Sequence, residues 1–310
     1  MVDLILFGDC KDTLKQFPRN SAQMCVTSPP YYGLRDYGGE EAQIGQEQTP
    51  EEFIDNLVSV FREVRDVLKD DGVLWVNIGD SYYNYRPGTG GLPKQTVSRT
   101  SQDLPEQCNR RANKLDGLKE KDMIGIPWML AFALRADGWY LRQDIIWHKP
   151  NPMPESVKDR CTKSHEYIFL LSKNKKYYYD NEAIKEPVKQ DWGKRDRTGG
   201  KYHNPGTGLQ PHSGLSKSYE RKNKRDVWSV TNKPYKGAHF ACFPPDLIEP
   251  CILAGSREGD VILDPFMGSG TTAMVAKQHD RHYIGCELHE EYGSLIQKRI
   301  KAIPTKLPML

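Results

Sequence analysis

The sequence has no closely spaced cysteine pair and no long apolar run. Its seven cysteines are scattered, with no C-x-x-C pair and no clustered set of cysteines and histidines. This pattern argues against a structural zinc site and favours a reducing compartment. No apolar stretch approaches the roughly 20 residues that a membrane-spanning helix needs. The N-terminus is acidic and strand-like, unlike a signal peptide. We therefore expect a cytoplasmic protein with no membrane contact and no metal site.

Positive charge is not lacking, but it is unevenly placed. The 310 residues are 37% hydrophobic and 27% charged, with a net charge of only +3, which suits a globular chain built around one large α/β domain. Between Ser172 and Lys236, however, there are 16 lysines and arginines against seven acidic residues. The rest of the chain is therefore net negative. A basic segment in such a chain indicates a polyanionic partner.

The stretch Thr27-Ser28-Pro29-Pro30-Tyr31 follows a short apolar run. The two prolines predict a stiff, open turn at the carboxyl end of a strand, which is where ligands bind in open α/β sheets. A serine hydroxyl beside a proline carbonyl offers two acceptors for one NH₂ group, and the tyrosine offers a flat face. That chemistry suits the exocyclic amine of a base. An ordinary strand-ending turn is the alternative.

Apolar periodicity predicts strands and helices along most of the chain. Strands are expected at residues 4–7, 22–27, 73–78, 140–148, 166–171, 261–263 and 283–286, and helices at 12–17, 50–68, 126–136, 244–254, 271–278 and 290–300. This alternation on both sides of the basic segment predicts one parallel, doubly wound sheet from which the segment hangs. Residues 84–122 are rich in glycine, proline, serine and glutamine, and we expect a long mobile loop there.

A second motif follows the strand expected at 261–263. Gly268-x-Gly270-x-x-Ala273 satisfies the dinucleotide fingerprint, and Glu287 follows the next strand at a distance suited to binding ribose hydroxyls. No Gly-Lys-Thr follows, which argues against a phosphate-gripping loop. Asp264 suits a cationic, amino-acid-bearing nucleoside better than a pyrophosphate. An NAD-dependent oxidoreductase is the alternative, disfavoured by the basic segment and by the C-terminal place of the glycine turn.

Together the two motifs resemble those of the amino-methylating DNA methyltransferases that use S-adenosyl-L-methionine. The catalytic motif of that family, (Ser/Asp/Asn)-Pro-Pro-(Tyr/Phe/Trp), matches Ser28 to Tyr31, and its cofactor motif, Asp-Pro-Phe-x-Gly-x-Gly-Thr-Thr, matches Asp264 to Thr272. The catalytic motif precedes the cofactor motif, which resembles the β group of the family. The resemblance covers nearly all of the chain except residues 84–122 and the basic segment.

The resemblance implies an α/β fold, a circularly permuted, Rossmann-like sheet of seven strands. Residues 1–172 would form the catalytic half with its mobile loop 84–122, residues 173–236 the basic target-recognition insert, and residues 237–310 the cofactor-binding half. The implied catalytic residues are Ser28, Pro29, Pro30 and Tyr31, and the implied cofactor-binding residues are Asp9, Phe243, Asp264, Pro265, Phe266, Gly268, Gly270, Thr271 and Glu287.

The implied reaction is methyl transfer to the exocyclic amine of a base flipped out of double-stranded DNA. In this family serine at the first motif position, here Ser28, mostly accompanies cytosine N4, whereas aspartate or asparagine mostly accompanies adenine N6. Cytosine N4 is therefore the expectation and adenine N6 the alternative. The setting would be restriction-modification or the protection of phage or host DNA. A cognate restriction endonuclease would be a partner that the reaction itself does not require.

Other chemistries fit the residues less well. Methylation at C5 needs a Pro-Cys nucleophile, but Pro250-Cys251 falls in an apolar helical stretch, where a buried core cysteine is the better interpretation. A non-enzymatic DNA-binding protein on the same scaffold is disfavoured by the intact motifs. His148 and Lys149 end a strand near Trp147, in a stretch that resembles the hairpin region of the family, and we expect loop or phosphate contacts there.

Overall fold

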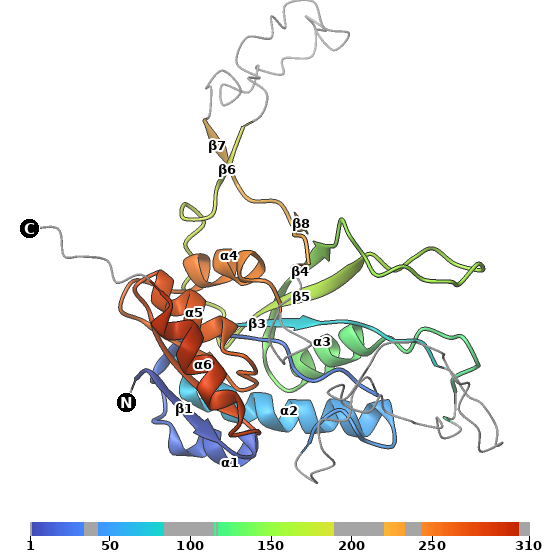
Figure 1. The fold of residues 1–310 in the computed structure, drawn as a ribbon, viewed down its shortest axis with the longest axis horizontal. Helices are drawn as coiled ribbons and strands as arrows, with labels where there is room; N and C mark the ends of the chain where they lie inside the picture. Colours follow the sequence, from blue (N-terminus) through green and yellow to red (C-terminus); the bar gives the residue numbers. More distant parts are fainter. Residues whose placement is uncertain are drawn as a thin grey trace, which may run out of the picture.

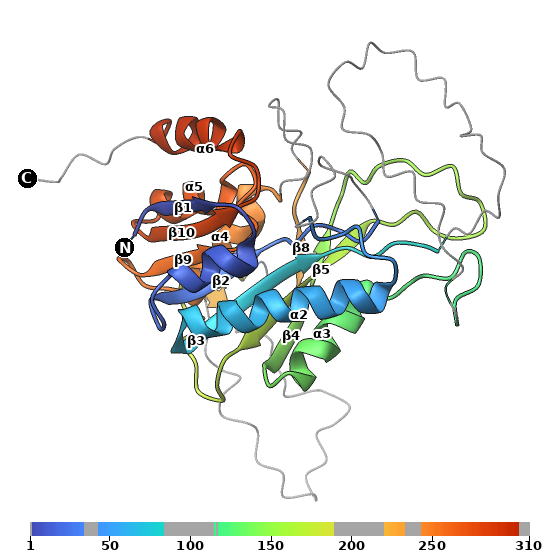
Figure 2. The same ribbon diagram turned by 90° about the horizontal axis from the view of Figure 1, so that it is seen from below.

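The computed structural model describes residues 2–33, 43–83, 115, 117–188, 220–232 and 243–303. Its centre is an eight-stranded sheet of order β1-β10-β9-β2-β3-β5-β4-β8, covered by helices on both faces (Figures 1 and 2). The strands are β1 (Leu4–Phe7), β2 (Ala22–Thr27), β3 (Leu68–Ile78), β4 (Tyr140–His148), β5 (His165–Ser172), β8 (Val227–Ser229), β9 (Val261–Asp264) and β10 (His282–Glu287). The helices are α1 (Cys10–Thr13), the 3₁₀ turn η1 (Leu14–Gln16), α2 (Pro50–Val67), α3 (Ile126–Ala136), α4 (Pro245–Gly255), α5 (Thr271–Gln278) and α6 (Tyr292–Lys301).

Two hydrophobic clusters hold the helices to the two faces of the sheet. Helices α1, α2 and α3 cover one face, and α4, α5 and α6 cover the other (Figure 2). Strand β3 supplies both clusters, because alternate side chains of a strand point to opposite faces. Leu74 and Val76 join the first cluster, and Val73 and Trp75 join the second. The centre of the sheet is therefore buried on both sides, as the continuous apolar strands predict.

Helix α2 illustrates how local sequence sets an element. Thr49 accepts a hydrogen bond from the backbone N–H of Glu52, whose carboxylate accepts one from the N–H of Thr49, which completes a capping box. Pro50 occupies the first turn, where its missing N–H costs nothing. The apolar side chains at spacings of three and four then lie against the sheet.

The prediction of one wholly parallel sheet is wrong at one side. Strands β1, β10, β9, β2 and β3 are parallel, but β5 runs antiparallel to both β3 and β4. The reason lies in the connection from β4 to β5, because residues 149–164 contain no helix that could return the chain to the opposite end of the sheet. The two strands therefore pair as a long hairpin.

The basic segment does not simply hang from the sheet. Strand β8, which lies inside the range expected for the insert, pairs in parallel with β4 and forms the edge of the sheet. Trp228 on β8 is only 5% exposed, and its ring lies 6.5 Å from that of Trp75. A second, two-stranded ribbon of β6 (Glu186–Pro187) and β7 (Arg221–Lys222) projects away from the body (Figure 1).

Strand β3 also begins earlier than expected. The strand was expected at 73–78, but β3 starts at Leu68 and includes Asp70-Asp71-Gly72. The pairing of β2 with β3 shifts register between Ala22 and Met24, and this irregularity accommodates the extra residues. Residues 84–114, most of the loop expected at 84–122, lie outside the described residues.

The strand order brings the two ends of the chain together. Strand β2 pairs with β3 on one side and with β9 on the other, while β1 pairs with β10. The carboxyl ends of β1, β10, β9 and β2 therefore lie along one edge of the sheet.

The division of the chain at residues 172–173 and 236–237 stays a prediction. Among the described helices none is long and apolar enough to cross a membrane.

Candidate active site

A buried hydrogen bond joins the two sequence motifs. The Thr27 hydroxyl, at the end of β2, donates to Oδ1 of Asp264 at 2.6 Å, and the Thr272 hydroxyl, at the start of α5, donates to Oδ2 at 2.6 Å. The backbone N–H of Phe266 also donates to Oδ1, at 3.0 Å. Asp264 is 1% exposed, and its burial raises the pKa of the carboxyl group to about 6, although the Thr27 and Thr272 hydroxyls act in the opposite direction.

This position adds a role that the sequence did not reveal. Asp264 was expected to face the positive end of a ligand, but both of its carboxylate oxygens accept hydrogen bonds from the protein's own groups. It therefore fixes the end of β9 to the end of β2. Its contribution to cofactor binding stays a prediction. Thr27 and Thr272 were not among the expected site residues, although Thr27 directly precedes the catalytic motif and Thr272 is the last residue of the cofactor motif.

The glycine turn after β9 is closed against the end of β10. The backbone N–H of Gly268 donates to Oε2 of Glu287 at 2.7 Å. Gly270 has a φ of 79°, and a Cβ atom there would lie 2.7 Å from Cγ2 of Ile296 on α6. Only glycine combines this backbone conformation with the close approach of α6.

Acceptor groups gather beside this turn. Glu287 is 7% exposed, and its burial raises the pKa of its carboxyl group despite hydrogen bonds from the backbone N–H groups of His289 and Gly268. On the neighbouring strand end, the carboxylate of Asp9 accepts from the N–H of Lys11 at 2.8 Å and caps α1. Carboxylate oxygens have lone pairs left for further donors such as ribose hydroxyls. The turn and these acids therefore fit a nucleoside.

The remaining expected cofactor residues are Phe243, Pro265, Phe266 and Thr271. Phe243 is buried just before α4, Pro265 is buried and Phe266 is half-buried. Thr271 is buried at the start of α5, where its hydroxyl accepts from the guanidinium of Arg299 on α6 at 3.0 Å. Pro265, Phe266 and Thr271 therefore lie at the same strand end as Asp264, and Phe243 joins the hydrophobic cluster that also contains Met267 and Ala273.

The proline motif lies directly beyond the Thr27 bridge. Pro29 is buried, whereas Ser28, Pro30 and Tyr31 are half-buried. The Tyr31 hydroxyl donates to Oε2 of Glu166 at 2.7 Å. The four expected catalytic residues are therefore placed together at the end of β2, next to the end of β9.

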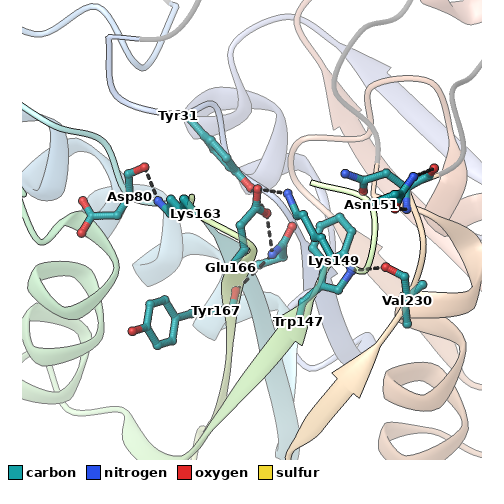
Figure 3. Close-up of polar contacts among 11 residues, drawn as sticks. Tyr31, Asp80, Trp147, Lys149, Asn151, Lys163, Glu166, Tyr167 and Val230 are labelled. Carbon is teal, nitrogen blue, oxygen red and sulfur yellow. Dashed lines mark hydrogen bonds and ion pairs between the residues drawn. The ribbon is translucent and has the colours of Figure 1, made fainter. Parts of the chain in front are cut away.

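Sequence reasoning missed Glu166. This residue lies on β5 and contacts Tyr31 and Lys149, which lies just after β4 (Figure 3). It also accepts a hydrogen bond from Asn77 on β3. The sequence offers no signal for this cluster, because its members come from four separate segments and their spacing shows no motif.

Cys251 is excluded as a nucleophile by its position. It is 0% exposed inside α4, its Sγ lies 3.8 Å from the carbonyl oxygen of Leu247, and burial raises the pKa of its thiol. A buried neutral thiol cannot attack a base. The interpretation as a core cysteine is confirmed.

Comparisons with known proteins agree with this site. A family model described as a DNA methylase, for N6 and N4 methylation, matches residues 22–298. The type II methyltransferase M.Cfr9I of Citrobacter freundii is 46% identical over 97% of this chain and 88% of its own length. The type II methyltransferase M.SmaI of Serratia marcescens is 48% identical over 96% and 90%.

Solved structures share the fold. The PvuII DNA methyltransferase, titled cytosine-N4-specific, matches with a TM-score of 0.63 at 18% identity over 98% of this chain and 87% of that one. A putative DNA modification methylase from Thermus thermophilus, complexed with S-adenosyl-L-methionine, gives 0.61 at 23% over 98% and 95%. The expected methyltransferase-type sheet is confirmed, with β8 added at its edge.

The raised pKa of Asp264 predicts a pH effect on stability. Because its pKa is about 6 in the folded protein against an ordinary 3.8, this group stabilises the fold below pH 4 and loses that contribution as pH rises through 6. The free energy of unfolding of the wild type minus that of Asp264→Asn should therefore fall by about 3 kcal/mol at most between pH 4 and pH 7. Urea unfolding at several pH values measures it. A constant difference would show that the pKa is not raised.

Proposed function

The chain belongs to the N6/N4 DNA methylase family, and from that premise we propose that it methylates the exocyclic N4 amine of cytosine in double-stranded DNA. The coarser activity follows from the family: the protein is a DNA methyltransferase of the type II, restriction-modification kind, and its cofactor is S-adenosyl-L-methionine. The target base, its flipping out of the duplex and the roles of individual residues belong to the proposal.

One observation carries the proposal. The hydrogen bond from Thr27 to Asp264 joins the residue before the Ser28-Pro29-Pro30-Tyr31 turn to the strand end that leads into the glycine turn at Gly268 to Gly270. An amine held at the first turn would then meet a methyl donor held at the second without a further change of fold. Holding two reactants in this way supplies a large share of a rate enhancement.

The cofactor side of the site would be formed by the strand ends of β1, β10 and β9. We assign to it the residues Asp9, Phe243, Asp264, Pro265, Phe266, Gly268, Gly270, Thr271 and Glu287. Glu287 would accept hydrogen bonds from ribose hydroxyls, as its acceptor capacity allows. When bound, S-adenosyl-L-methionine supplies a methyl group made electrophilic by its attachment to a sulfonium.

The base side would be formed by the proline motif. A base amine inside a duplex is out of reach, so the nucleotide would be flipped out and stacked on Tyr31. The Ser28 hydroxyl and the Pro29 carbonyl would each accept a hydrogen bond from one N–H group of the amine. These contacts would orient the nitrogen and draw its lone pair out of conjugation with the ring, which favours in-line attack on the methyl group. As the N–C bond forms, the methyl–sulfur bond would break with its electron pair going to sulfur, so that a neutral thioether leaves, and the methylated amine would then release one proton to solvent. Positioning and electrostatics then lower the barrier without a covalent enzyme intermediate.

The choice of cytosine rests on Ser28. In this family a neutral serine at that position mostly accompanies cytosine N4, and Asp or Asn mostly accompanies adenine N6. Adenine N6 is the alternative target of the same site.

The basic segment is proposed as the DNA-reading region. Its lysines and arginines between residues 173 and 236 would bind phosphates, and its side chains would read bases in the major groove. Its edge strand β8 pairs with the end of β4. The next residue, Lys149, pairs with Glu166, which binds Tyr31, so contact with DNA would be made on the side of the sheet that holds the proline motif. A cognate restriction endonuclease is proposed as the biological partner.

The product identifies the function directly. Plasmid DNA incubated with the protein and S-adenosyl-L-methionine, then digested to nucleosides, should contain N4-methyldeoxycytidine by mass spectrometry, and DNA incubated without the cofactor should not. N6-methyldeoxyadenosine in its place would transfer the proposal to adenine. The plasmid should carry many sequence contexts. If neither methylated nucleoside is found after the reaction, the proposal is contradicted altogether.

Substitutions should separate the two sides of the site. Ser28→Ala should lower the single-turnover rate of methyl transfer by about tenfold to a hundredfold, since one acceptor for the amine is lost. Its dissociation constant for the cofactor should stay unchanged in equilibrium dialysis. Glu287→Ala should weaken cofactor binding instead.

Ser21→Ala is the matched control for this pair of variants. Ser21 lies just before β2, where its hydroxyl donates to the carbonyl of Pro18, so its loss should change neither quantity. The reverse pattern, with Ser28 affecting the cofactor and Glu287 only the transfer rate, would show that the two sides have been assigned the wrong way round.

A further inference from the structure

A half-enclosed carboxylate lies at the hydroxyl end of Tyr31. Oε2 of Glu166 accepts hydrogen bonds from the Tyr31 hydroxyl at 2.7 Å and from the Asn77 side-chain amide at 3.3 Å (Figure 3). The same amide donates to the carbonyl of Tyr167 at 3.1 Å. Asn77 therefore ties the carboxylate to the backbone pairing of β3 with β5, which are rigid strands of the sheet.

The other carboxylate oxygen of Glu166 is bound by a lysine. The ammonium of Lys149 forms an ion pair with Oε1 and lies 4.2 Å from the centre of the Trp147 ring. The side chains of Glu166 and Lys149 are only 14% and 17% exposed. A carboxylate so enclosed needs a compensating charge. The ammonium faces Glu166 in this arrangement, whereas the sequence suggested a loop or phosphate contact.

The ring of Tyr31 is also confined by the backbone of Gly79. A Cβ atom at Gly79 would lie 2.8 Å from Cε2 of Tyr31 and 3.3 Å from Cδ of Glu166. Any other residue at this position would therefore push the ring and the carboxylate out of place. Close packing at the ring and a charged hydrogen bond at its hydroxyl together fix one orientation.

We propose that Glu166 is a positioning residue for methyl transfer. Paired with Lys149, it holds the Tyr31 ring in the orientation on which a flipped base stacks, so that the base amine is presented to Ser28 and Pro29 at the correct angle. A tyrosine rather than a phenylalanine is needed at position 31 because the hydroxyl is the point of attachment. This inference rests on the proposed function.

The charge of Lys149 gives the pair a second effect. Methyl transfer places positive charge on the amine nitrogen as the N–C bond forms. An unpaired ammonium of Lys149 near the proline motif would repel the positive charge that develops on the amine nitrogen. An ammonium paired with the Glu166 carboxylate repels it far less. A second lysine lies near the pair, since Lys163 donates to the backbone carbonyl of Asp80 and interacts with Glu166.

A double-mutant cycle tests the positioning role. Tyr31→Phe and Glu166→Gln should each lower the single-turnover rate of methyl transfer by about tenfold, and the double variant should be no more than about twofold slower than the slower single variant. The dissociation constant for S-adenosyl-L-methionine should not change in any of the three. A role confined to stability would not produce this dependence of one residue on the other in the rate.

Two further variants complete the experiment. Asp260→Asn breaks a similar ion pair, with Lys69, and should leave the rate unchanged. If Glu166→Gln folds poorly, Glu166→Asp keeps the charge but withdraws the carboxylate from the hydroxyl, and should give the same non-additivity with Tyr31→Phe.

The outcomes separate this inference from the proposed function. Effects of Tyr31→Phe and Glu166→Gln that multiply to about a hundredfold, or a Glu166 variant with wild-type rate, would overturn the positioning role alone, because the wild-type enzyme would still methylate DNA. Absence of methyl transfer by the wild type would overturn the proposed function, and this inference with it.

Discussion

One buried hydrogen bond, from the hydroxyl of Thr27 to the carboxylate of Asp264, holds the site together. The two residues are 237 positions apart in sequence, yet they end adjacent strands of one sheet. The Thr272 hydroxyl donates to the second oxygen of the same carboxylate, and this second hydrogen bond fixes the start of α5. Because the Asp264 carboxyl group is buried, the loss of any hydrogen bond that it accepts would leave an unsatisfied polar atom and destabilise the fold. The hydrogen bonds of Asp264 therefore set the proposed base side and the proposed cofactor side of the site relative to each other.

The proposed base side of the site extends from that hydrogen bond. Ser28 and Pro29 follow Thr27 directly, so their placement depends on the end of β2. Tyr31 lies farther along and is held from the other half of the sheet, by Glu166 on β5 and by the backbone of Gly79 after β3. The sheet thus positions the Tyr31 ring and the proposed amine acceptors, Ser28 and Pro29, from opposite sides. Loop residues in such a site gain precision from the rigid strands that support them.

The sequence predicted the parts of the fold that depend on local patterns. The helix at 50–68, the strands before the two motifs and the burial of Cys251 follow from spacing and composition, and the family was evident from the two motifs. The reversed strand β5 and the edge strand β8 were not predicted, because both depend on pairing between distant segments. Glu166 was missed for the same reason, since its partners come from β3, the turn after β2 and the turn after β4.

The measurement that tests this account most directly is the effect of Thr27→Val on methyl transfer. Valine keeps the shape of threonine and has a methyl group in place of the hydroxyl, so it cannot donate the hydrogen bond. If the bond sets the two sides of the site, the single-turnover rate should fall about tenfold while the dissociation constant for S-adenosyl-L-methionine stays within about twofold of the wild-type value. A variant that is less stable to urea but transfers the methyl group at the wild-type rate would contradict the account.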